Sequence, residues 1–114
     1  MRVLVVGAGR SGARVIRQLR KNPAIEIITA DPRVDSYAVE HGVIESPDIQ
    51  EAFTPLTVDY VLEQARPDLV LLAAATEDLG LGEAPGIDIL ADALRQELAS
   101  ASDVPMIEIA RYGE

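Results

Sequence analysis

Apolar runs alternate with amphipathic segments along the chain. The five runs predict strands at residues 2–6, 25–30, 43–45, 68–75 and 105–109. The first and the fourth run are continuous, a pattern typical of parallel strands that are buried on both faces. The segments between the five runs repeat apolar residues at helical spacing and predict helices over residues 10–20, 35–41, 49–65 and 86–101, the third interrupted by Pro55. This alternation predicts an α/β fold, a doubly wound parallel sheet of about five strands in the order 3-2-1-4-5 between two helical layers.

A glycine-rich turn joins the first predicted strand to the first helix. Its residues are Gly7-Ala8-Gly9-Arg10-Ser11-Gly12. In this strand–turn–helix context the spacing is the dinucleotide-binding fingerprint of Rossmann-like folds. Gly7 allows the tight turn, Gly9 lets bare backbone approach a pyrophosphate, and Gly12 lets the helix pack closely. The first helical turn then offers N–H groups and the positive end of the dipole to phosphates, with Ser11 as a further hydrogen-bond donor.

Acidic and basic residues follow the second predicted strand. Asp31 lies 19 residues after Gly12, close to the spacing of a carboxylate that binds the ribose hydroxyls of a dinucleotide. A carboxylate there repels a 2′-phosphate and favours NAD(H) over NADP(H). Arg33 can accommodate that phosphate, so NADP(H) stays open. The loop after the fourth strand should face the glycine turn, which makes Ala75 and Thr76 further candidate cofactor-binding residues.

The predicted first helix carries a basic stripe opposite its apolar face. The stripe consists of Arg10, Arg14, Arg17 and Lys21. Cations in this position are typical of a solvated face that also complements the helix dipole at its C-terminal end. Arg10 alone lies close enough to the glycine turn to contact a ligand.

Length and composition limit the possible functions. With 114 residues, the chain is expected to form a single domain, residues 1–114, too short for a nucleotide domain and a substrate domain together. A net charge of −9 argues against a nucleic-acid surface, which needs a basic excess. The absence of cysteine excludes disulfides and fits a reducing cytoplasm. No apolar run reaches the roughly 18 residues of a membrane span, so we expect a cytoplasmic protein without direct membrane insertion.

Catalytic side chains are few in this sequence. His41 is the only histidine, and it precedes Gly42, the predicted C-cap of a short helix, where an exposed imidazole is the expected state. Tyr37 and Tyr60 lack the lysine four residues on that short-chain reductases pair with their tyrosine. We therefore predict no catalytic residue and no metal ligand, and leave open whether the protein is an enzyme.

The sequence resembles the nucleotide-binding regulatory domains of potassium transporters and channels, the TrkA-N or RCK type. The similar stretches are residues 3–12, the strand ending at Asp31, Glu40-His41-Gly42-Val43, Ala74-Ala75-Thr76-Glu77-Asp78 and Val104-Pro105-Met106-Ile107. The resemblance implies a cytoplasmic NAD(H)- or ADP/ATP-binding module that dimerises and reports nucleotide state to a membrane transporter or channel subunit. Carried over by position, it assigns phosphate, ribose and pocket contacts to Gly7, Gly9, Ser11, Gly12, Asp31 and Thr76. An exposed edge strand at residues 107–109 also invites pairing with a second copy.

Other resemblances support alternative functions. The glycine turn and Asp31-Pro32 are similar to the N-terminal half of Gfo/Idh-type dehydrogenases, and Arg66-Pro67-Asp68 is similar to an extended short-chain reductase. Both families use a catalytic lysine that this chain does not have. The chain would then be the cofactor-binding half, or a truncated relative, of an NAD(P)-dependent oxidoreductase. A third interpretation is an adenosyl-methionine methyltransferase, a class that also combines a glycine-rich turn with an acidic residue after the second strand.

Overall fold

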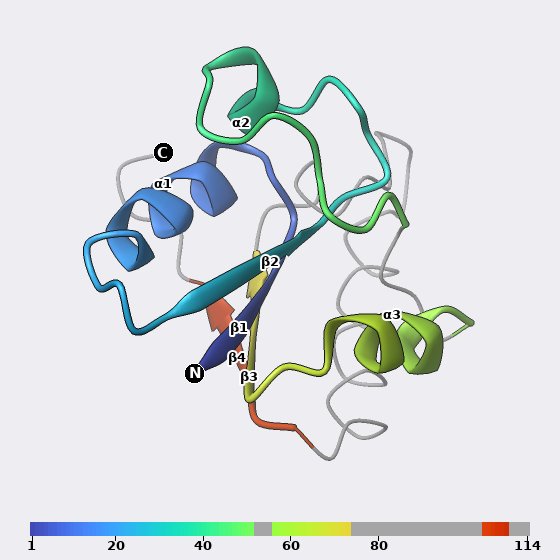
Figure 1. The fold of residues 1–114 in the computed structure, drawn as a ribbon. Helices are drawn as coiled ribbons and strands as arrows, with labels where there is room; N and C mark the ends of the chain where they lie inside the picture. The colour runs from blue at the N-terminus through green and yellow to red at the C-terminus, as the bar shows by residue number, and fades with distance from the viewer. Residues whose placement is uncertain (52–55, 74–103, 110–114) are drawn as a thin grey trace.

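The computed structural model describes residues 1–51, 56–73 and 104–109, which form an α/β fold (Figure 1). The elements in chain order are β1 (Arg2–Val6), α1 (Arg10–Leu19), β2 (Glu26–Ala30), α2 (Tyr37–Glu40), α3 (Val58–Ala65), β3 (Leu69–Ala73) and β4 (Met106–Ile109). Four of the predicted strands and the first predicted helix are confirmed, and within the described residues their boundaries differ by at most one residue. The helix expected over residues 86–101 lies outside the described residues.

The four strands form one parallel sheet in the order β2-β1-β3-β4. This order agrees with the predicted neighbours of the first, second, fourth and fifth apolar runs and is compatible with a Rossmann-like fold. Val6 at the end of β1 pairs with Ala30 on one side and with Leu72 on the other. The carboxyl ends of three strands are therefore level, at the edge where open α/β sheets bind ligands.

Alternate residues of β1 pack against helices on opposite faces of the sheet (Figure 1). Leu4 and Val6 belong to an apolar cluster with residues of α3, and Val3 and Val5 belong to a second cluster with residues of α1 and α2. All four of these β1 side chains are at most 2% exposed. The continuous apolar run is thus explained by burial on both faces.

The third predicted strand, at residues 43–45, is wrong. Val43 is buried in the cluster beneath α1 and α2, so its apolar character reflects core packing without strand pairing. A single parallel bridge, between Ala30 and Ile49, occupies the outer edge of β2 instead. The ladder stops there because Pro47, two residues before Ile49, has no N–H to donate to β2.

The two shorter helices also differ from their predicted bounds. α2 covers only Tyr37–Glu40, and Gly42 follows it with a φ of 70°, the left-handed conformation expected of a C-cap. α3 begins at Val58 and not at residue 49, because Ile49 is engaged in the bridge to β2. Arg66 ends α3 in a left-handed conformation, with a φ of 47°, directly before Pro67.

Candidate functional site

The glycine turn leaves β1 through a conformation that favours glycine. Gly7 has a φ of 96°, and its N–H donates to the carbonyl oxygen of Ala30 at 2.8 Å. A Cβ placed on Gly12 would overlap the carbonyl oxygen of Gly7. The start of α1 therefore packs directly on the backbone of the turn, as the predicted role of Gly12 requires.

The first turn of α1 carries no negative side chain. Gly9 is the N-cap residue and has no side chain with which to cap the helix, and its carbonyl accepts the N–H of Ala13 at 2.8 Å. Ser11 and Gly12 are buried in this first turn. A helix start without an acidic side chain in its first turn favours an anion such as a phosphate through the positive end of its dipole.

Asp31 lies against the glycine turn. Its Oδ2 accepts the N–H of Ala8 at 2.8 Å, and the residue is 1% exposed. This bond joins the residue that follows β2 to the turn that follows β1. The carboxylate that the sequence singled out as a ribose ligand is thus within one hydrogen bond of the predicted phosphate-binding loop.

Arg33 binds the same Asp31 carboxylate. Its Nη2 donates to Oδ2 of Asp31 at 2.8 Å, its Nε donates to Oδ1 at 3.0 Å, and its backbone N–H donates to Oδ1 at 2.8 Å. With Ala8, each carboxylate oxygen accepts two hydrogen bonds, and the Asp31 side chain has no exposed surface. A ribose hydroxyl can reach this carboxylate only by replacing donors of the Arg33 side chain, which is 33% exposed.

The start of α2 is attached to the glycine turn from the other side. The N–H of Ala38 donates to the carbonyl oxygen of Ala8 at 2.9 Å. Ser36, the N-cap residue of α2, is 2% exposed, and its hydroxyl has no hydrogen-bond partner in the described part of the chain. No local pattern in the sequence marks Ser36, because its burial depends on the docking of α2.

An aromatic pair lies beside the turn. The Arg10 guanidinium lies over the Tyr37 ring, 5.5 Å from its centroid, and that ring stacks on His41 at 3.9 Å between centroids. Both Arg10 and His41 are exposed. The spacing of four residues between Tyr37 and His41 was a visible signal for this contact, because residues i and i+4 are neighbours on a helix.

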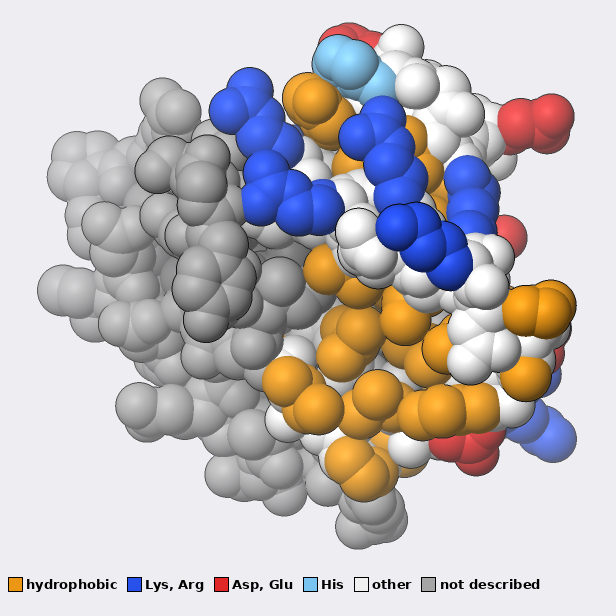
Figure 2. Space-filling view, turned by 90° about the vertical axis from the view of Figure 1, so that its left-hand side faces the viewer, with side chains coloured by type: hydrophobic (Ala, Val, Ile, Leu, Met, Phe, Trp, Pro, Cys, Tyr) orange, Lys and Arg blue, Asp and Glu red, His pale blue; other side chains and the backbone are white. Residues whose placement is uncertain are grey.

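Cations concentrate on the face of the molecule that carries α1 (Figure 2). Half of the ten cationic residues of the chain lie exposed on α1 and the turn after it: Arg10, Arg14, Arg17, Arg20 and Lys21. Of these, Arg10 stands in the glycine turn itself, and the others follow along the helix. This arrangement agrees with the expected basic stripe.

Two of the predicted site residues, Ala75 and Thr76, lie outside the described residues. β3 ends at Ala73, one residue after the pair formed by Val6 and Leu72. In residues 1–51, 56–73 and 104–109, no group of three or more His, Cys, Asp or Glu side chains could hold a metal ion. In the same ranges, no helix has the length and apolar character needed to cross a membrane.

The described site thus combines a glycine turn, a helix start without negative charge, and a buried carboxylate held by Arg33. Groups of these kinds bind the anionic and the polyhydroxylated parts of dinucleotides in Rossmann-like folds, and in this structure the turn from Gly7 to Gly9 and the Asp31 side chain are buried. Comparisons with protein-family models, with curated proteins and with solved structures give no match to this chain.

Proposed function

We propose that this protein is an NAD(H)-binding regulatory module, with the diphosphate on the glycine turn and the adenosine ribose at Asp31. The observation that carries the proposal is the 2.8 Å hydrogen bond from the Ala8 N–H to Asp31. This bond joins the candidate ribose-binding residue directly to the candidate phosphate-binding turn. We further propose that the single bridge at Ile49, on the outer edge of β2, takes the position of the third strand in the order 3-2-1-4-5.

The phosphate half of the proposal is supported by the close contact between Gly12 and Gly7. Because a side chain on Gly12 would overlap the Gly7 carbonyl, the turn keeps bare backbone at the start of α1. Backbone amides at a helix start bind phosphates through hydrogen bonds and through the helix dipole. Arg10 adds a cation at the same position.

The proposed binding of the adenosine ribose at Asp31 depends on Arg33. For NAD(H), the ribose hydroxyls take the place of Nε and Nη2 on the Asp31 carboxylate, and the half-buried guanidinium turns away from it. For NADP(H), the guanidinium stays near Asp31 and pairs with the 2′-phosphate. We favour NAD(H) because a 2′-phosphate would stand beside a buried carboxylate, and we keep NADP(H) and ADP or ATP as the alternative ligands.

A regulatory role is supported by the resemblance of the sequence to TrkA-N domains. In this role the module is a cytoplasmic homodimer, and nucleotide binding shifts it between two arrangements that a membrane transporter or channel subunit reads. Such a shift requires the nucleotide to bind the two arrangements with different affinity.

Calorimetric titration with NADH, NAD, NADPH, ATP and ADP tests the proposal. We expect NADH or NAD to bind most tightly. Asp31→Asn should weaken that binding about tenfold or more, because a charge-assisted hydrogen bond contributes roughly 1.5–3 kcal/mol. Asp35→Asn is the matched control, since Asp35 is exposed in the same loop. Equal affinity for NADPH, or equal effects of the two substitutions, would contradict the proposal.

A further inference from the structure

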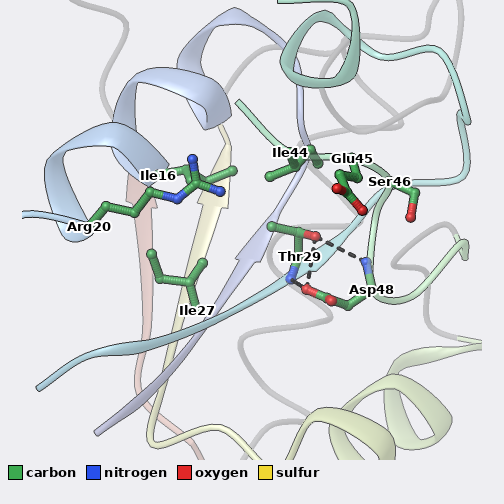
Figure 3. Close-up of a pocket in the computed structure, with 8 residues that line it drawn as sticks. All are labelled: Ile16, Arg20, Ile27, Thr29, Ile44, Glu45, Ser46 and Asp48. Carbon is green, nitrogen blue, oxygen red and sulfur yellow. Dashed lines mark hydrogen bonds between the residues drawn. The ribbon is translucent and has the colours of Figure 1, made fainter. Parts of the chain in front are cut away.

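A cavity of about 380 Å³ opens at the outer edge of β2, away from the glycine turn (Figure 3). It lies between β2, the C-terminal half of α1 and the segment of residues 44–48. Its apolar lining consists of Ile16, Ile27 and Ile44, one from each of these parts. Its size is within the range of small-molecule sites, about 300–1,000 Å³.

The cavity lies where none of the described strands extends along the outer edge of β2. The N–H of Thr29 donates to Oδ2 of Asp48 at 2.9 Å, and the carbonyl of Thr29 accepts the N–H of Ile49 at 2.9 Å. Backbone groups alternate along a strand, so Ile27, two residues earlier, turns its N–H and carbonyl to the same outer edge. No described residue pairs with these groups of Ile27, and the edge of the sheet is open there.

Two side chains of opposite charge line this cavity without contacting each other. Arg20, at the end of α1, and Glu45, in the facing segment, lie on opposite sides of it (Figure 3). In the described part of the molecule, neither side chain forms an ion pair or a hydrogen bond. The other carboxylate in the lining, that of Asp48, is already engaged, because its Oδ2 binds both the N–H and the hydroxyl of Thr29.

We propose that this cavity binds a free α-amino acid. The ligand carboxylate pairs with the Arg20 guanidinium, and its ammonium group pairs with the Glu45 carboxylate. The side chain of the ligand lies over Ile27 and Ile44, the half-buried apolar residues of the lining. A zwitterion satisfies both uncommitted charges at once, whereas an anion or a cation alone satisfies one and leaves the other facing it.

This site is independent of the proposed nucleotide site. The two lie at opposite ends of α1, since the glycine turn precedes the helix and Arg20 follows its last residue. Failure of nucleotide binding and failure of amino-acid binding can therefore be observed separately in one sample.

The test is a titration of the ¹⁵N-labelled chain with leucine, isoleucine and valine, followed by amide chemical shifts and by calorimetry. Isopentylamine, which lacks the carboxylate, and 4-methylpentanoate, which lacks the ammonium group, are the matched ligands. We expect leucine to shift the amides of Ile27 and Ile44 at millimolar concentration. We expect the two single-charge ligands to bind at least about tenfold more weakly, as the loss of one charged hydrogen bond implies.

Two exposed lining residues provide variants that preserve the fold. Arg20→Gln and Glu45→Gln should each weaken leucine binding about tenfold. Arg17→Gln and Glu40→Gln are the controls, because both residues are exposed and neither lines the cavity. No leucine binding, leucine-induced shifts at the glycine turn, equal binding of the single-charge ligands, or equal effects of lining and control variants would overturn the proposal.

Discussion

The guanidinium of Arg33 holds the buried carboxylate of Asp31 through two side-chain hydrogen bonds, from Nη2 at 2.8 Å and from Nε at 3.0 Å. The same carboxylate accepts the N–H of Ala8, so the cation, the carboxylate and the glycine turn form one connected unit. In this unit Arg33 stabilises the buried charge of Asp31, and in the proposed function it would compete with a ribose for that carboxylate.

The effects of Arg33→Ala on the stability of the fold and on the choice of cofactor should therefore be measurable separately. Asp31 has no exposed surface and would lose two charged donors, so we expect the free energy of unfolding to fall by about 1–3 kcal/mol. Urea unfolding measures this loss. Arg17→Ala removes an exposed cation of α1 and should change stability by no more than about 0.5 kcal/mol.

The same Arg33→Ala variant tests the choice of cofactor. Without the competing guanidinium, NADH should bind more tightly relative to NADPH than it does in the unaltered chain. Calorimetric titration of both cofactors gives this ratio directly. An unchanged ratio would show that Arg33 does not take part in selecting the ligand.

Two glycine substitutions compare a packed position with an open one. Gly12→Ala forces a Cβ onto the Gly7 carbonyl. Because a backbone carbonyl cannot move aside as a flexible side chain can, we expect this overpacking to destabilise the fold by about 3 kcal/mol or more. Gly42→Ala places its Cβ in open space, and only the left-handed φ of 70° costs energy there, about 1–2 kcal/mol. Thermal and urea unfolding should rank the two in this order. An equal or reversed order would refute the close contact at Gly12.

The hydroxyl of Ser36 is buried without a partner in the described residues. A buried unsatisfied polar group lowers stability, so Ser36→Ala should leave the free energy of unfolding unchanged or raise it by up to about 1 kcal/mol. Ser46→Ala, at an exposed position, is the control. A loss of more than about 1 kcal/mol in Ser36→Ala would mean that the hydroxyl has a structural partner.

Asp48 replaces a neighbouring strand at the edge of β2. Its carboxylate accepts the N–H and hydroxyl of Thr29, and its own N–H donates to the Thr29 hydroxyl at 3.1 Å. We expect Asp48→Ala to destabilise the fold by about 1–3 kcal/mol, and Asp48→Asn, which keeps an acceptor oxygen, to cost less. Asp35→Ala, at an exposed position, should have little effect. Urea unfolding compares all three.

The main elements were predictable because burial on both faces leaves a simple signal. β1 and β3 are continuous apolar runs, and Gly7 and Gly12 mark the turn that the structure shows. The third strand was mispredicted because Val43 is apolar for packing beneath α1 and α2, while Pro47 removes the N–H that strand pairing needs. An apolar run of this length cannot distinguish the two cases.

The details of the site were less predictable. The spacing of Asp31 from Gly12 indicated where the carboxylate would lie, but not that Arg33 would cover it, since that contact depends on a side-chain conformation and on burial. Ser36 and the cavity at Ile27 depend on how α2 and the segment of residues 44–48 dock on the sheet. These are tertiary relationships that a local pattern does not contain.

The proposed function depends above all on diphosphate binding by the glycine turn. Amide chemical shifts of the ¹⁵N-labelled chain during titration with NADH report on this contact residue by residue. We expect the largest changes at Gly7, Ala8, Gly9 and Gly12, with a further change at Asp31. Changes confined to other parts of the chain, or no change at saturating NADH, would rule out nucleotide binding at the turn.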